Sequence, residues 1–290
     1  MNRAQLTWTP NKLFTATVGR QRVNLDDQRF IGSVNWRQDE QTLDAVRGDF
    51  AYGKLKATYL YIGKVNRIYA QALDWDSDSH ALTAAYDFGA PLKLEGFFYA
   101  LDFKQAPSSS TKTVGVRATG ALKFDAVKLA YAGSYAHQTD YRNNPGDFGL
   151  DYWMGEGAAT YGAFTVKVNY ESLAGDGKRG FATPLATLHA FQGWADVFLT
   201  TPTRGIDDIN LSLSVKPPVK LPHLTNVELF LRHHDFSYQQ GGGSLGTEWD
   251  AQVSASFTRQ LTGLFKYADY DGVAGFPSRR KVWLGLEFKL

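Results

Sequence analysis

Hydrophobic and polar residues alternate along most of this chain, in successive segments of about ten residues. The clearest segment, 164–171, reads FTVKVNYE, and the same alternation returns at 209–216, 249–257 and 282–288. Successive residues of a β-strand point to opposite faces, so each segment has one apolar and one polar face. A strand between lipid and water needs this pattern. Because the alternation recurs along the whole chain, it predicts an all-β protein. It favours a transmembrane antiparallel β-barrel over a soluble sandwich.

The alternation and the turn residues predict fifteen strands in this chain. They are expected at 3–9, 13–25, 43–52, 54–65, 80–89, 93–104, 111–123, 126–141, 149–161, 163–174, 206–216, 223–238, 246–258, 260–271 and 281–290. Short connections alternate with longer ones, which lie at 26–42, 66–79, 105–110, 142–148, 175–205, 239–245 and 272–280. Outer-membrane barrels place short turns in the periplasm and long loops outside. The connection lengths therefore predict the sidedness of the barrel.

The first and the last expected strand both run toward the periplasm. Bacterial single-chain barrels have an even number of strands with both ends periplasmic, so one or three strands are expected to be missing at the front. The opening residues MNRAQ also lack the apolar stretch of a signal peptide. We therefore expect a single barrel domain over residues 1–290, part of a barrel of 16 or 18 strands whose N-terminal strands and signal peptide are absent.

Composition narrows the class of protein further. No run of about twenty apolar residues occurs, which argues against helical membrane spans. The 290 residues include no cysteine, which suits an oxidising cell envelope, and 31 basic residues nearly balance 29 acidic ones, which argues against a nucleic-acid partner. The expected location is the outer membrane of a Gram-negative bacterium. The expected partners are outer-membrane lipid, lipopolysaccharide, the barrel-assembly machinery and a small polar or anionic solute, with no cofactor.

Two blocks of sequence carry a family resemblance. The first holds GRQ at 19–21, DDQRFIG at 26–32, WRQ at 36–38 and QTLDA at 41–45, and the second reads TPLATLHAFQGWAD at 183–196. Both are similar to the alginate-export-like family of proteobacterial outer-membrane porins. The resemblance implies an eighteen-stranded barrel. In a family member that exports an anionic uronate polysaccharide, it also implies a lumen rich in arginine. Fold alone does not transfer the substrate.

Phasing each strand by its apolar face predicts which side chains line the pore. The cationic ones are Arg47, Lys56, Arg117, Lys128, Lys167, Lys216 and Arg232, and the acidic ones are Asp49, Glu171, Glu228, Asp250 and Glu287. Fixed positive charge in a water-filled pore concentrates anions, so a mild anion preference follows as a hypothesis. The alternative is that these charges pair across strands and merely solvate the wall.

Three arginines of the first block, Arg20, Arg29 and Arg37, are weaker candidates for substrate binding. A guanidinium can hold a carboxylate with two parallel hydrogen bonds, so three of them near one pore mouth could guide an acidic solute. The alternative, which we favour, is that Asp26, Asp27 and Asp44 pair with these arginines and fix a long loop against the barrel wall.

The connection at 175–205 is long and apolar, and long ordered loops are usually functional. Helical spacing of its apolar residues after Thr183-Pro184 predicts a short helix. Folded into the barrel, this loop would narrow the pore, and the predicted constriction residues are Leu185, His189, Phe191, Trp194 and Asp196. The alternative is a loop that caps the outside or packs on a neighbouring protomer.

Aromatic residues are expected in the interfacial girdles or inside the pore. The girdle candidates are Trp8, Tyr59, Tyr61, Tyr86, Tyr131, Tyr135, Tyr152, Tyr170 and Trp249, and those that phase inward are Phe98, Trp153, Phe230 and Trp283. No catalytic residues are predicted, because His233 and His234 of the His233-His234-Asp235 run point to opposite faces of one strand. The acidic run 74–78 could offer oxygen ligands to calcium but lacks an EF-hand pattern, so no metal site is predicted.

The function expected from these features is a passive diffusion channel of the outer membrane for small or oligomeric polar, anionic solutes. Export of an anionic, alginate-like polysaccharide is the first alternative, and a barrel enzyme is a remote second.

Overall fold

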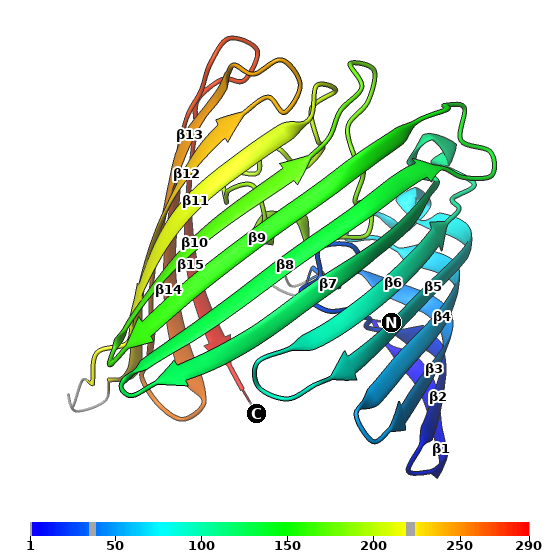
Figure 1. Cartoon of the computed structure of the whole chain (residues 1–290), viewed down its shortest axis with the longest axis horizontal. Helices are drawn as coiled ribbons and strands as arrows, with labels where there is room; N and C mark the ends of the chain where they lie inside the picture. The colour runs from blue at the N-terminus through cyan, green and yellow to red at the C-terminus, as the bar shows by residue number, and fades with distance from the viewer. Residues whose placement is uncertain (1, 35–38, 219–223, 290) are drawn as a thin grey trace. The chain divides into compact units, whose positions relative to one another are not determined.

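The computed structural model describes residues 2–34, 39–218 and 224–289. Fifteen antiparallel strands form one sheet, in which each strand neighbours the next in sequence (Figure 1). Their bounds are β1 Ala4–Asn11, β2 Phe14–Gln21, β3 Thr42–Tyr52, β4 Leu55–Asn66, β5 Trp75–Asp87, β6 Lys93–Leu101, β7 Thr111–Phe124, β8 Val127–Asp140, β9 Gly149–Tyr161, β10 Phe164–Leu173, β11 Ile206–Val215, β12 Thr225–Ser237, β13 Ser244–Ser256, β14 Leu261–Asp271 and β15 Arg279–Phe288. Within these ranges the helical elements are the 3₁₀ turns η1 Gln71–Leu73, η2 Pro107–Ser109 and η3 Leu188–Ala190. No helix in the described ranges is long and apolar enough to cross a membrane.

The fifteen expected strands are all present, and β5 is the one whose start differs most. It begins at Trp75 and not at residue 80, because Trp75 and Asp76 pair with Val65 and Lys64 of β4. Part of the acidic run 74–78 is therefore strand and not loop. Asp76 and Asp78 are two residues apart and share one face of β5. Among the described residues, no group of three or more His, Asp or Glu side chains could hold a metal.

Each strand presents one apolar and one polar face. In β10, Val166 and Val168 are 45% and 49% exposed, whereas Glu171 on the opposite face is buried. We call the side of the exposed hydrophobic residues the apolar face and the opposite side the polar face. Loop residues cover parts of the polar face, and for this reason charged side chains there can be buried.

Three aromatic residues lie on the face opposite to the predicted one. Tyr152 was expected in a girdle, but it is buried on the polar face, where its ring centroid lies 5.4 Å from that of Phe30. Trp153 and Phe98 were expected to point inward, but they are exposed on the apolar face. Their strands contain aromatic or small residues on both faces, so hydrophobicity alone did not reveal the phase. Contact with a loop distinguishes the two faces, as the packing of Tyr152 on Phe30 shows.

The chain divides into two compact units, and the 175–205 loop contributes to both. Unit 1 comprises residues 1–119, 134–153 and 180–188, and unit 2 comprises 120–133, 154–179 and 189–290. In unit 1 the ring of Phe30 packs among four aromatic side chains, those of Phe97, Tyr99, Tyr152 and Phe181. In unit 2 the ring of Phe198 packs on Phe236 and Tyr270, with centroids 4.9 and 5.7 Å apart. These clusters place loop residues on strands.

Candidate functional site

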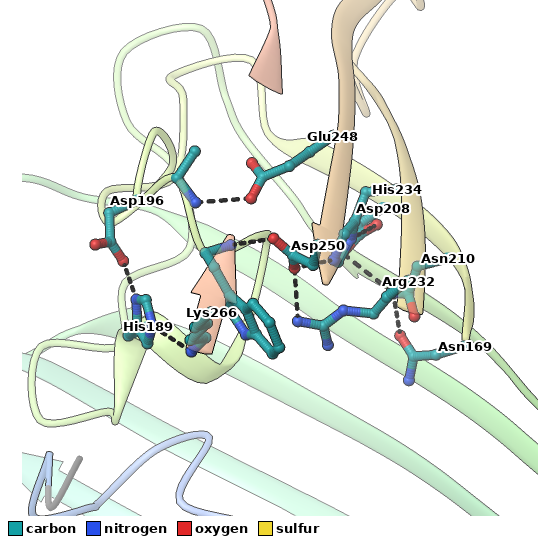
Figure 2. A network of polar contacts seen from close by, with 12 residues as sticks. Asn169, His189, Asp196, Asp208, Asn210, Arg232, His234, Glu248, Asp250 and Lys266 are labelled. Atoms are coloured by element: carbon teal, nitrogen blue, oxygen red, sulfur yellow. Dashed lines mark hydrogen bonds and ion pairs between the residues drawn. The ribbon is translucent and has the colours of Figure 1, made fainter. Parts of the chain in front are cut away.

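The loop after β10 meets a buried network of charged side chains in unit 2 (Figure 2). Figure 2 shows that His189 and Asp196 come from the loop and that the strands β11 to β14 contribute most of the other residues. Trp194 also belongs to the loop. The strand residues are Asp208, Asn210, Arg232, His234, Glu248, Asp250 and Lys266. Arg232 is the most exposed of them, with 12% of its side chain accessible, and the others are buried. Burying so many charges is costly unless each has a partner. Each buried charge is therefore expected to have a partner.

His189 joins the loop to β14. Its Nε2 lies 2.7 Å from Lys266 Nζ, and its Nδ1 lies 2.7 Å from Asp196 Oδ1. An ammonium can only donate, so Nε2 accepts and Nδ1 carries the proton that is donated to Asp196. Burial lowers the pKa of His189, which agrees with a neutral ring.

Asp196 holds the loop to β15 as well as to His189. Its Oδ2 lies 2.7 Å from Lys281 Nζ, and Arg279 Nη1 donates to the carbonyl oxygens of Ala195 and Asp196 at 3.2 and 2.9 Å. Burial would raise the pKa of Asp196, but the hydrogen bonds from His189 and Lys281 outweigh it, so this pKa is lowered. The carboxylate therefore stays ionised and keeps both partners.

Trp194 packs among aromatic and cationic groups. Its ring centroid lies 3.6 Å from Lys266 Nζ and 5.3 Å from the guanidinium carbon of Arg232. The ring stacks on that of Phe230 at 5.4 Å. Cations over the face of an indole ring are attracted to it, more strongly when water is excluded. The arrangement places two positive charges and a planar aromatic surface on the polar face of β12 and β14.

Two carboxylates of β13 bind the loop backbone. Glu248 Oε1 accepts the Ala195 amide at 2.7 Å, and Asp250 Oδ1 accepts the Trp194 amide at 3.3 Å. Gly193 has a φ of +82°, and a side chain there would overlap the Glu248 carboxylate. Glycine therefore meets two needs, a left-handed backbone and close approach to β13.

Asp250 also begins a chain of polar contacts that runs across the strands. Its Oδ2 accepts from Arg232 Nη2 at 3.0 Å and lies 3.5 Å from His234 Nε2. The Nδ1 of His234 lies 2.8 Å from Asp208, which accepts from Asn210 at 3.3 Å. These contacts partner most of the buried charged groups on this wall of the site, while Arg232 Nε and Glu248 Oε2 have no hydrogen-bond partner among the described residues.

The residues of the loop that belong to unit 1 are anchored separately. Gln41 Nε2 donates to the carbonyl of Leu185 at 3.1 Å, and Thr187 Oγ1 donates to Gln28 at 2.7 Å. Gln138 donates to the carbonyl of Ala182 at 2.8 Å. These contacts fix residues 182–187 to two other segments of unit 1, the loop after β2 and the strand β8.

All seven predicted pore-lining cations belong to the polar face, and five of them are paired with acids. Their ion pairs are Arg47 with Asp49 at 2.7 Å, Arg117 with Asp26 and Asp27 at 2.7 Å, Lys167 with Glu156 at 2.9 Å, Lys216 with Glu228 at 3.4 Å and Arg232 with Asp250 at 3.0 Å. In the described part of the chain no ion pair forms at Lys56 or Lys128. Pairing within a strand, between strands and with the loop after β2 thus masks most of the positive charge that the sequence suggested.

The arginines of the first sequence block do not form a ladder. Arg20 lies on the apolar face of β2 and forms two hydrogen bonds with Asp44, at 2.7 and 3.0 Å. Arg29 is buried and donates to Thr183 at 3.1 Å, with its guanidinium over the Tyr152 ring. Arg37 lies outside the described residues. Asp26 and Asp27 form ion pairs with Arg117, and Asp27 also accepts the main-chain amide of Arg29 at 3.0 Å.

The predicted constriction residues lie in two parts of the loop, and the predicted helix is absent. Leu185 is buried in unit 1, whereas His189, Phe191, Trp194 and Asp196 belong to unit 2. The loop forms only the 3₁₀ turn η3, because Gln192, Gly193 and Asp196 adopt positive φ angles that end a right-handed helix. The Trp194 and Ala195 amides are bound by strand carboxylates, so a helix is not needed to satisfy them.

Sequence reasoning missed Lys266, Glu248 and Asp208. Each lies on the polar face of its strand, and the alternation of the strand was the signal that could have placed it there. It could not show that a distant loop would bury them. The histidines weighed for catalysis separate as expected, since His233 packs on Trp249 at 4.5 Å and His234 bonds to Asp208 on the other face.

Solved structures with a similar fold are outer-membrane porins. The similar chains include OccAB4 of Acinetobacter baumannii, with 14% identity, a TM-score of 0.77 and coverage of 96% of this chain and 72% of that chain. OpdK of Pseudomonas aeruginosa, solved with vanillate, has 14% identity, a TM-score of 0.73 and coverage of 96% and 76%. A BenF-like porin from Pseudomonas fluorescens Pf-5 has 12% identity, a TM-score of 0.76 and coverage of 96% and 75%.

These likenesses show the fold, that of a transmembrane antiparallel β-barrel, and fifteen of its strands lie in the described residues. No curated protein matches the sequence. The sequence model described as alginate export matches residues 4–171, more than half of the chain, and includes the GRQ and DDQRFIG motifs of the first block. The chain belongs to the alginate export family.

Proposed function

We propose that this protein is a passive outer-membrane channel for small or oligomeric polar solutes, with a preference for anions. The observation that carries the proposal is the fixation of loop residues 189–196 on the polar face of unit 2. Carboxylates of β13 hold the loop backbone, and cations of β14 and β15 hold its side chains. A loop held in this way is a permanent constriction rather than a mobile lid.

The anion preference rests on Lys266 and Arg232 beside Trp194. Both cations are buried against the Trp194 ring, so they act through their positive potential, which favours a solute that carries a carboxylate. OpdK, a structural relative of this chain, was solved with vanillate, a molecule of this kind. The preference should be mild, because Asp250 and other acids pair with most cations on the polar face.

Export of an anionic polysaccharide is the second candidate, and the family to which the chain belongs favours it. A long acidic polymer needs a continuous run of uncompensated positive charge. The ion pairs at Arg47, Lys167 and Arg232 interrupt such a run. We therefore place the small-solute channel first.

Single-channel recording in a planar bilayer tests the proposal. We expect discrete open currents and a reversal potential that favours chloride over potassium in a salt gradient. Absence of conductance would reject the channel, and preference for potassium would reject the anion selectivity. A block of the current by acidic oligosaccharides, with no block by aromatic carboxylates, would favour the export candidate.

A further inference from the structure

A polar pocket of about 510 Å³ lies in unit 1, where β2, β3 and β4 reach the long loops. Its lining includes Arg20, Glu40, Asn66, Arg67, Tyr69 and Asp74. Arg20 is two residues from Val18, which is 49% exposed, and on the same face of β2. The pocket therefore borders the apolar face and not the polar one. Long loops of outer-membrane barrels are extracellular, so this rim lies at the level of the outer-leaflet headgroups.

Arg67 is the unusual group of this pocket. Its guanidinium carbon lies 4.0 Å from the ring centroid of Trp75 and 4.8 Å from that of Tyr69. Aromatic faces contact the flat sides of a guanidinium and leave its N–H edge available for oxygen atoms. Burial lowers the pKa of Arg67, which indicates that the acids nearby compensate its charge incompletely.

The other cations around the pocket already have carboxylate partners. Arg20 bonds to Asp44, Arg22 bonds to Glu40, and Lys64 lies 3.5 Å from Asp74. Within the described ranges, Arg67 has no carboxylate partner, and its main-chain nitrogen is the group that Asp74 binds. One stacked, pre-oriented cation is thus left for an external anion.

Groups that suit sugar hydroxyls surround this cation. Asn66 is only 8% exposed, and its Oδ1 has no hydrogen-bond partner among the described residues. A buried acceptor without a partner is costly, and a hydroxyl donor would satisfy it. Asp39 adds a carboxylate, and the Tyr69 ring is 54% exposed, which offers an apolar surface to a sugar. Phosphate, hydroxyls and a sugar ring together match these groups.

We propose that this pocket binds a phosphorylated sugar, with the edge of the Arg67 guanidinium holding the phosphate and with Asn66 and Asp39 accepting hydroxyl groups. The position at the rim of the apolar face makes the headgroup of an outer-leaflet glycolipid the expected source. Such a contact would anchor the barrel at a defined height and orientation in the outer leaflet. This site is separate from the channel proposed above and does not depend on it.

Native mass spectrometry of the full chain in detergent tests the site. The probes are a diphosphorylated glucosamine glycolipid, the same glycolipid after removal of its phosphates, and free glucosamine 1-phosphate. Arg67→Gln should weaken binding of the phosphorylated glycolipid about tenfold, as expected for the loss of one charge-assisted hydrogen bond. Arg204→Gln is the matched control, because Arg204 also stacks on a tyrosine, Tyr238 at 4.1 Å, but already donates to the carbonyls of Gln240 and Gly242.

The outcomes separate clearly. Weaker binding in Arg67→Gln with unchanged binding in Arg204→Gln supports the site. Retention of the glycolipid without binding of free glucosamine 1-phosphate assigns it to the membrane, whereas tight binding of the free sugar phosphate assigns the same site to a soluble ligand. Equal binding by Arg67→Gln and the wild type, or equal retention of the dephosphorylated glycolipid, overturns the proposal. Arg67→Lys, which keeps the charge but loses the flat stacked edge, should lie between the two.

Discussion

The Nζ atom of Lys266 lies 3.6 Å from the centroid of the Trp194 ring, so a strand cation and a loop aromatic meet in the buried site of unit 2. Lys266 also contacts His189 at 2.7 Å, which ties the same strand to a second loop residue. The loop and the buried charge of unit 2 are therefore coupled. A change in either residue should alter both the width and the selectivity of the channel.

Trp194→Ala should enlarge the constriction. The substitution removes the ring that contacts Lys266, Arg232 and Phe230, and a buried Trp to Ala change costs about 3 to 5 kcal/mol. Single-channel conductance should rise and the open state should become noisier. Trp153→Ala is the control, because Trp153 is exposed on the apolar face, and its conductance should equal that of the wild type. Equal conductance in Trp194→Ala would show that this loop does not limit the current.

Asp250→Asn should increase the preference for anions. Asp250 now pairs with Arg232 at 3.0 Å, and removal of its charge exposes that of Arg232 to a permeating solute. The reversal potential in a potassium chloride gradient should shift toward that of chloride, and the protein should lose about 3 to 5 kcal/mol of stability for a broken buried pair.

The matched control for this change is Asp269→Asn. Asp269 pairs with Arg280 at 2.9 Å, but from the opposite face of β14 relative to Lys266. Its neutralisation removes the same formal charge and should leave the reversal potential unchanged. An equal shift in both variants would mean that net charge, and not the polar face of β13, sets the selectivity.

Much of this architecture could be predicted from the sequence, because alternation is a local property. The faces of Lys167 and Val168 follow from their neighbours alone, and the fifteen strands follow from such runs and their turns. The site could be predicted only in part. Trp194 and Ala195 are bound by carboxylates 56 and 53 residues away, and no local pattern indicates this pairing. The predicted helix was wrong for the same reason, since long-range acceptors replaced its hydrogen bonds.

Gly193→Ala should loosen the loop more than an ordinary glycine substitution does. At a φ of +82°, alanine costs about 1 to 2 kcal/mol in backbone strain, and its methyl group would also overlap the Glu248 carboxylate. Thermal unfolding in detergent and current noise should both report the change. Gly162→Ala separates the two effects, because Gly162 has a φ of +56° in the β9–β10 turn and no atom lies within 4 Å of an added methyl group. Identical losses in the two variants would rule out the clash.

Acidification should release the loop by protonating His189. Burial lowers the pKa of His189 in the folded state, so the unfolded state binds more protons, and the contribution of this group to stability is complete above about pH 6.5 and declines as the pH falls toward the folded pKa. The lowered pKa of Asp196 acts in the same direction at still lower pH, below about 3.8. A protonated His189 can no longer accept from Lys266, and two cations then face each other. We expect wild-type current noise to rise between pH 7 and pH 5.

Two histidine variants test the role of His189. His189→Gln retains a donor and an acceptor and should show a smaller change in noise over this pH range. His80→Gln is the control, because His80 lies in unit 1, where its Nδ1 is 2.7 Å from the Tyr59 hydroxyl, and this variant should behave like the wild type. An unchanged pH response in His189→Gln would assign the acid sensitivity to another group.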